Sequence, residues 1–209
     1  ELGHSVSKAV ITVPAFFSEI QRESTRQAGE LAGLDVVRII NEPTAAALTY
    51  EPHPSDVERL LVYDLGGGTF DVALIKIKDG EMKVLDHEGD NFLGGADFDN
   101  LIIEKLIIPY LNKNFKFNDL ENEMKSRTGK LNKLYFRLLK LAEDAKITLS
   151  SRTSAEIEVR DITDDNGEEI DISIDITRSE FEGVIKEYID KTLDMIKKIL
   201  VRNSLKPSD

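Results

Sequence analysis

The chain has 209 residues, 41% of them hydrophobic, which is enough for one large or two small domains with a buried core. Its 39 acidic and 27 basic residues give a net charge of −12, which argues against a broad nucleic-acid-binding surface. The lack of cysteine excludes disulfides and is typical of a reducing compartment, so we expect a cytoplasmic location. Charged residues interrupt the longest apolar run, residues 101–111, and the chain opens on a polar stretch. We therefore expect neither a membrane span nor a signal peptide.

The first 41 residues have a strand–helix–strand pattern. Two short β-branched runs, residues 9–13 (AVITV) and 36–40 (VVRII), predict buried strands. Between them, Ser18 and Gln21 have the spacing of a capping box, and small or apolar residues continue a helical pattern to about Gly33. These signals together predict an α/β unit.

A second helix and an antiparallel meander are expected next. Pro43 stands where a first helical position would be, so the helix directly follows the strand. Residues 51–58 (EPHPSDVE) contain two prolines and several acidic side chains, which indicates a linker. Three strands with a turn at Asp79–Gly80 follow it, at residues 60–65, 69–78 and 81–87.

The rest of the chain mixes helical and strand patterns without a 20- to 50-residue repeat. Helices are expected at residues 97–113 and 130–150. They are followed by strands at residues 155–162 and 169–176, which a turn at residues 164–167 joins. Ser179 and Glu182 have capping-box spacing and predict a last helix that runs to Val201. The alternation favours α/β lobes over a solenoid.

The segment YDLGGGTFDV, residues 63–72, is the most informative motif. Three consecutive glycines weaken a strand but permit backbone angles that let successive N–H groups converge on an anion. No G-x-x-x-x-G-K-[ST] segment and no helix-opening G-x-G-x-x-G segment is present, so these glycines join strand to strand. We interpret Gly66, Gly67 and Gly68 as a phosphate-binding turn, with the Thr69 hydroxyl beside it. The alternative is an ordinary hairpin whose glycines allow a tight bulge.

Carboxylates flank this turn. Asp64 precedes the glycines, Asp71 follows Thr69, and Glu42 lies at the end of an earlier strand. Magnesium keeps several of its waters and uses one or two carboxylates, so these three side chains can hold a hydrated Mg²⁺. The alternative is that the two aspartates only cap turns.

One face of the expected helix at residues 130–150 carries three polar groups. Glu143, Lys146 and Ser150 are spaced i, i+3 and i+7, so they present an acceptor, a cation and a hydroxyl together. Taken alone, this pattern is typical of a solvated helix face.

Five segments resemble, in the same order, the nucleotide-binding domain of the bacterial-type seventy-kilodalton heat-shock chaperones: AVITVPAFF, RIINEPTAAALTY, YDLGGGTFDV, NFLGGADFDN and AEDAKITLSS. The resemblance implies an actin-like ATPase (ribonuclease H-like) α/β fold, in which parts of two lobes have mixed sheets flanked by helices. ATP or ADP with Mg²⁺ would lie in the cleft between the lobes. Residues 1–54 would form part of lobe I, residues 55–94 and 172–209 the core of lobe II, and residues 95–171 its mobile outer subdomain.

The resemblance also implies roles for individual residues. The catalytic residues would be Asp64, Glu42, Thr69 and Asp71, of which Asp64, Glu42 and Asp71 would contact the metal through water. The nucleotide would be bound by Gly66, Gly67, Gly68, Thr69, Gly95, Glu143, Lys146 and Ser150. Pro14 and Arg22 would relay the nucleotide state to a substrate-binding domain. Their simpler interpretations are a strand end and an ordinary helix-surface residue.

Some features of the family pattern are changed or missing. Ile147 replaces an arginine that often packs on adenine, and Ala96 replaces a glutamate. The family's first phosphate hairpin with its essential lysine would precede Glu1, and a second adenosine motif would follow Asp209. We therefore expect the isolated chain to bind nucleotide weakly and to hydrolyse it little.

Beyond the nucleotide, the resemblance implies partners of the full-length protein: unfolded polypeptides, a J-domain co-chaperone and a nucleotide-exchange factor. Two alternatives stay open, a sugar-kinase-like or filament-forming relative and a non-catalytic docking module. His4, His53 and His87 lack ligand spacing and are expected at the surface. No nucleophile elbow is present, so covalent hydrolase chemistry is not expected.

Overall fold

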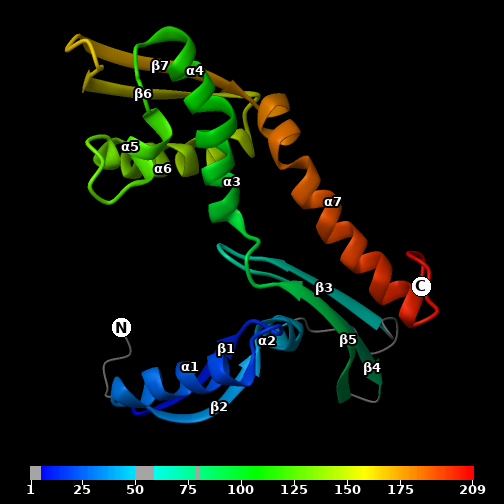
Figure 1. Ribbon diagram of the computed structural model, residues 1–209. Coiled ribbons are helices and arrows are strands. Elements are labelled where there is room, and N and C mark those ends of the chain that lie inside the picture. Colours follow the sequence, from blue (N-terminus) through cyan, green and yellow to red (C-terminus); the bar gives the residue numbers. More distant parts are fainter. Residues whose placement is uncertain (1–5, 50–58, 79–80) are drawn as a thin grey trace. The chain divides into compact units, whose positions relative to one another are not determined.

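The computed structural model describes residues 6–49, 59–78 and 81–209, and the fold is mixed α/β, as predicted (Figure 1). The chain forms two compact units: unit 1 comprises Glu1–Gly94 with Asp190–Asp209, and unit 2 comprises Gly95–Ile189. The predictions for His4, His53, the linker at residues 51–58 and the Asp79–Gly80 turn lie outside the described residues. None of the helices in the described part combines the length and the apolar composition that crossing a membrane requires.

Unit 1 begins with the predicted strand–helix–strand segment. Strands β1 (Lys8–Val13) and β2 (Asp35–Asn41) pair in parallel, and helix α1 (Glu19–Leu31) connects them. The Ser18–Gln21 capping box is present, with both reciprocal hydrogen bonds. This confirms the prediction and explains why the helix starts where it does, because the box satisfies N–H groups that have no partner within the helix.

The antiparallel meander of unit 1 is also confirmed. Helix α2 (Glu42–Thr49) follows β2 directly, with Pro43 in its first turn. The three strands are β3 (Arg59–Leu65), β4 (Phe70–Lys78) and β5 (Glu81–Asp90), with β4 in the centre. Ala47 of α2 packs with buried residues of β4, so this helix covers part of the meander.

Unit 2 opens with one helical run, made of α3 (Gly95–Ile102), the π-helical turn η1 (Ile103–Ile107) and α4 (Ile108–Asn114). The helix predicted at residues 97–113 is thus confirmed. The wide turn lies just before Pro109, which has no N–H to donate and whose ring would clash with the carbonyl four residues earlier. A π-turn at this point lets the run continue past the proline.

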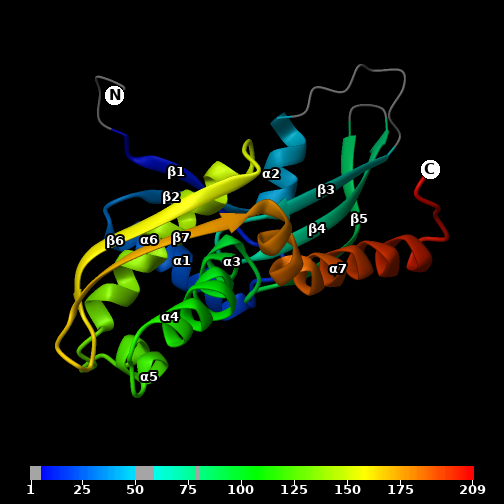
Figure 2. The ribbon, with the colours of Figure 1, turned by 90° about the horizontal axis from the view of Figure 1, so that it is seen from above.

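A second helical layer and a hairpin complete unit 2. Helix α6 (Asn132–Leu149) packs against strands β6 (Ser154–Thr163) and β7 (Glu169–Thr177), which pair antiparallel through the predicted turn (Figure 2). The short helix α5 (Leu120–Lys125) was not predicted, because it buries only two apolar side chains and gives no extended period. The core of the unit includes Leu111, Met124, Leu138, Ile157 and Ile172.

The long helix α7 (Arg178–Arg202) starts with a different cap from the predicted one. The N–H and hydroxyl of Thr177 both donate to the Glu180 carboxylate, at 2.9 and 2.6 Å, and the Glu180 N–H donates back to the Thr177 hydroxyl at 3.2 Å. The prediction of Ser179 and Glu182 was therefore wrong by two residues. Strand β7 ends at Thr177, and the helix begins immediately after it, so the strand end sets the position of the cap.

Replacing Thr177 with alanine should therefore lower the free energy of unfolding by about 1 kcal/mol, because the Glu180 N–H in the first turn of α7 loses its acceptor. Ser179→Ala is the matched control and should change it by less than about 0.5 kcal/mol. Denaturant unfolding of both variants measures the difference. A larger loss of stability in Ser179→Ala than in Thr177→Ala would instead support the predicted cap at Ser179.

Candidate functional site

The three glycines form an open turn between β3 and β4. The Gly66 N–H donates to the Thr69 carbonyl at 2.9 Å, and a side chain built at Gly67 or Gly68 would meet nothing within 4 Å. Of the glycines that the structure describes, only Gly33 and Gly167 have a positive φ. The prediction that Gly66, Gly67 and Gly68 use backbone angles that only glycine reaches easily was thus wrong with respect to positive φ. Their absent side chains instead leave the exposed backbone at Gly67 and Gly68 open to close approach.

Gly94 supports this turn from behind. A Cβ atom at Gly94 would lie 2.4 Å from the Gly68 nitrogen and 2.5 Å from the Gly67 carbonyl carbon. Only glycine permits this backbone-to-backbone packing. Gly95 was assigned to nucleotide binding in the sequence analysis, and this contact of Gly94 was not predicted. The boundary between the two units falls between Gly94 and Gly95.

Two of the predicted carboxylates face each other across the sheet. Asp64 on β3 is the direct antiparallel partner of Asp71 on β4, so the two side chains lie on the same face. Asp71 is only 1% exposed, and its Oδ1 atom accepts a hydrogen bond from the Phe16 N–H at 3.1 Å. Like charges in directly opposite positions destabilise a sheet, so this arrangement has a cost that ordinary packing does not explain.

Glu42 completes the acidic cluster. It is the first residue of α2, and its pKa is raised by burial and by the negative charges of Asp64 and Asp71. The pKa of Asp71 is also raised, mainly by burial and further by Asp64, although the Phe16 N–H opposes the shift. The structure therefore brings the three predicted carboxylates together in a site with excess negative charge. A hydrated Mg²⁺ fits this donor set, because it would relieve that charge while using few direct ligands.

The loop after β1 is tied to both Asp71 and helix α1. Arg22 donates from Nη2 to the Ala15 carbonyl at 2.9 Å and from Nε to the Phe17 carbonyl at 3.1 Å, with Pro14 O at 3.5 Å from Nη2. Arg22 is therefore not an ordinary helix-surface residue, because its guanidinium holds the loop that donates to Asp71. The relay role of Pro14 and Arg22 stays a prediction.

In unit 2, the structure brings together Gly95, Lys146 and Ser150. The Lys146 ammonium contacts the Asp99 carboxylate at 2.7 Å and the Gly95 carbonyl at 2.9 Å, and the Ser150 hydroxyl donates to the Lys146 carbonyl at 3.4 Å. Asp99 is a buried partner that sequence reasoning missed. The only feature of the sequence that could have indicated Asp99 is its spacing, because it lies in α3 four residues after Gly95.

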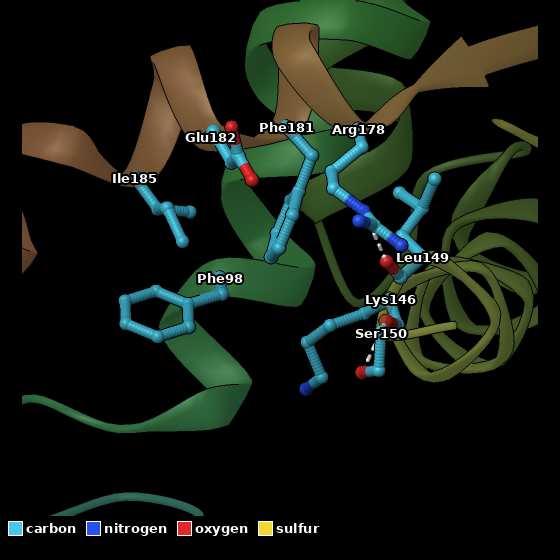
Figure 3. A pocket seen from close by; sticks show the side chains of 8 residues that line it. All are labelled: Phe98, Lys146, Leu149, Ser150, Arg178, Phe181, Glu182 and Ile185. Atoms are coloured by element: carbon cyan, nitrogen blue, oxygen red, sulfur yellow. Dashed lines mark hydrogen bonds between the residues drawn. The ribbon is translucent and has the colours of Figure 1, made fainter. Parts of the chain in front are cut away.

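Lys146 and Ser150 line a cavity of about 400 Å³, which Figure 3 shows, together with Phe98, Leu149, Arg178, Phe181, Glu182 and Ile185. Glu143 does not line it and instead pairs with Lys140 at 2.9 Å. The predicted helix face is thus only partly assembled around the cavity. Ile147, at the position of the family's arginine, is 60% exposed.

The one histidine that the described ranges include is at the surface, as predicted. His87 is exposed and lies edge-on to Phe16, with ring centroids 6.0 Å apart. No group of three or more histidine, aspartate or glutamate side chains in this part of the chain has an arrangement for holding a metal directly.

The raised pKa of Asp71 predicts a pH dependence of stability. A carboxyl whose pKa is higher in the folded chain disfavours folding when ionised, so its cost appears as pH rises from the unfolded pKa through the folded one. Asp71→Asn keeps an oxygen for the Phe16 N–H and should be more stable than the parent at pH 7, with the difference shrinking towards pH 4. Thermal unfolding across this pH range tests it, with Asp35→Asn at an exposed strand end as control. A less stable Asp71→Asn variant at pH 7 would contradict the result.

The glycine contacts predict opposite outcomes at two positions. Gly94→Ala should lower the free energy of unfolding by about 1–3 kcal/mol or prevent folding, because the new methyl group would collide with backbone atoms. Gly67→Ala has open space and a compatible backbone, so its stability should change by less than about 1 kcal/mol. Denaturant titration compares the two. Equal stability losses would show that Gly94 does not pack as described.

Comparison with known proteins extends over the whole chain. The family described as Hsp70 protein matches residues 1–209. Chaperone protein DnaK of Anaplasma marginale (strain St. Maries) is 45% identical over 199 residues, which are 95% of this chain and 29% of that protein. Mitochondrial-type heat shock protein 70 of Encephalitozoon hellem is 41% identical over 208 residues, which cover 100% of this chain and 33% of the relative. The chain thus spans about a third of the length of these relatives, and it belongs to the Hsp70 family.

Proposed function

We propose that this chain is part of the ATP-binding and ATP-hydrolysing domain of a molecular chaperone. The observation that carries the proposal is the gathering of Glu42, Asp64 and Asp71 beside an open glycine turn. Family membership supports this chemistry over a sugar-kinase-like relative. It also supports the actin-like fold and its division into two lobes, which we carry over as part of the proposal.

In this proposal the turn binds the phosphates. The Gly67 and Gly68 N–H groups have no side chains beside them and would donate to phosphate oxygens at close range. The Thr69 hydroxyl would donate to the terminal phosphate. Gly94 would keep the turn in place, because its backbone packs directly against Gly67 and Gly68.

The three carboxylates would hold the hydration shell of Mg²⁺. When bound, the ion would neutralise charge that develops on the phosphate oxygens. Asp64, at the end of β3, would orient the attacking water. Asp71 has its Oδ1 atom fixed by the Phe16 N–H and would keep its other oxygen for a metal-bound water. Their closeness, costly without a cation, supports this assignment.

In unit 2, Lys146 and Ser150 would contact the adenosine portion, with Gly95 beside them. The Lys146 ammonium already contacts Asp99 and the Gly95 carbonyl, so its position is set before a nucleotide arrives. Glu143 would have to leave its exposed contact with Lys140 to take part. Ile147 removes guanidinium stacking, so the base would be held by fewer contacts than in relatives with arginine.

The partners and the location of the full-length protein are inferred from the family and are part of the proposal. The full-length protein would bind unfolded polypeptides, a J-domain co-chaperone and a nucleotide-exchange factor. Pro14 and Arg22 would pass on changes at Asp71, a role supported by the contacts of Arg22 with the loop whose Phe16 N–H donates to Asp71. We propose a cytoplasmic location, although one relative carries a mitochondrial-type name.

The decisive test is Asp64→Asn in the full-length protein. We expect single-turnover ATP hydrolysis to slow by about 100-fold or more, because the attacking water loses its orienting carboxylate. The calorimetric Kd for ATP with Mg²⁺ should change by less than about 10-fold, since the groups proposed to bind the phosphates directly do not include Asp64. Asp35→Asn is the matched control and should change neither quantity. Equal losses in hydrolysis rate and in ATP affinity would mean that Asp64 has only a structural role. Absence of ATP binding by the parent protein would overturn the proposed function.

A further inference from the structure

The segment just after β5 carries an unassigned polar side chain near the acidic cluster. The Asn91 side-chain nitrogen donates to the Phe16 carbonyl at 3.1 Å. Its Oδ1 atom is buried, and no described residue donates a hydrogen bond to it. A buried acceptor without a donor is destabilising, so such an atom calls for a functional explanation.

The orientation of this amide is determined by its partner. The Phe16 carbonyl can only accept, so the Asn91 nitrogen must face it and the oxygen must point elsewhere. Reversing the amide would place two acceptors against each other and would leave the nitrogen without a partner. The unsatisfied acceptor is therefore a consequence of the Phe16 contact.

Asn91 lies close along the chain to a neighbour of the acidic cluster. On β5, Gly89 is the direct partner of Asp71, and Asn91 follows two residues later, in the turn directly after the last strand residue, Asp90. A side chain built at Gly89 would lie 3.0 Å from Asp71 Oδ1 and 3.2 Å from the Phe16 Cβ. The missing side chain at Gly89 thus leaves space around Asp71.

Two contacts hold Asn91 beside the cluster independently of any ligand. Phe16 donates through its N–H to Asp71 and accepts through its carbonyl from Asn91, so a single residue links both side chains. At the neighbouring position, Asp90 accepts from the Phe92 N–H at 2.8 Å and fixes the turn that follows the strand. Asn91 is thus held in one orientation, as a positioning residue needs to be.

We propose that Asn91 is a positioning residue of the cation site, whose amide oxygen accepts a hydrogen bond from a water molecule held by Mg²⁺. The inference rests on the proposed function, since it requires that Glu42, Asp64 and Asp71 hold a hydrated ion. A metal-bound water is the fitting donor, because it has hydrogens to share and the nearby carboxylates have none when ionised. Asn91 would thereby fix the position of one water of the shell.

The direct test is spectroscopic and needs no catalysis. The full-length protein, with ¹³C at the side-chain carbonyls of asparagine and aspartate, is titrated with Mg²⁺ in the presence of ADP. The Asn91 carbonyl signal, assigned by its loss in Asn91→Asp, should shift together with those of Asp64 and Asp71. The Asn203 signal is an internal control, because that amide donates to Asp86 and to the Ile199 carbonyl and should stay unchanged. Carboxyl shifts without a shift of Asn91 would overturn this inference alone, whereas the absence of any carboxyl shift would overturn the proposed function.

Two variants separate the oxygen from the nitrogen. Asn91→Leu lacks both groups and should weaken Mg²⁺ binding about 10-fold, as loss of outer-shell partners does. Asn91→Asp lacks the donor to Phe16 but keeps an acceptor oxygen, so it should bind Mg²⁺ at least as well as the parent. Phe92→Asp adds the same charge at an 86%-exposed neighbour and corrects for the general effect of charge. Equal weakening in the leucine and aspartate variants would mean that only the Phe16 contact matters.

Discussion

Two aspartates stand opposite each other on adjacent strands, and much of unit 1 is arranged around them. Asp64 and Asp71 are direct partners in an antiparallel pair, with Asp71 almost fully buried. Sheets normally place opposite charges or apolar pairs in such positions, because like charges repel and burial removes the water that would screen them. The raised pKa of Asp71 reflects this conflict. Such a pair lowers stability, and the cation proposed for this site would relieve the repulsion.

The surroundings of this pair come from segments far apart in the sequence. The loop after β1 supplies the Phe16 N–H, α2 supplies Glu42, and β5 supplies a glycine that leaves space for the Asp71 side chain. Arg22 does not touch the carboxylates, but it fixes the carbonyls of the loop that does. A change in the charge state of the cluster therefore has a short covalent and hydrogen-bonded route to helix α1. This gives the proposed relay a physical basis in contacts rather than in distance alone.

Sequence reasoning performed well where the signal is local. The Ser18 capping box, the three-stranded meander and the hairpin turn at residues 164–167 all follow from short-range chemistry and are present as predicted. It failed where neighbouring segments decide between similar local options. Thr177 caps α7 instead of Ser179, because β7 ends two residues earlier than the competing motif requires. The glycine turn shows the same limit, since the strand-to-strand turn is present but none of its three glycines has the positive φ that only the backbone of the folded chain could reveal or exclude.

The sequence by itself identified the carboxylates and the glycine turn as candidate site residues from residue type and spacing, whereas the helix with Lys146 became a candidate only through the family resemblance. Only the tertiary structure decided their partners. Gly94 against Gly67, Asp99 against Lys146 and Phe16 between Asp71 and Asn91 are contacts between segments, and no period or local motif encodes them. The physical reason is that spacing along a chain specifies which face a side chain occupies, whereas the packing of separate elements specifies what lies opposite that face.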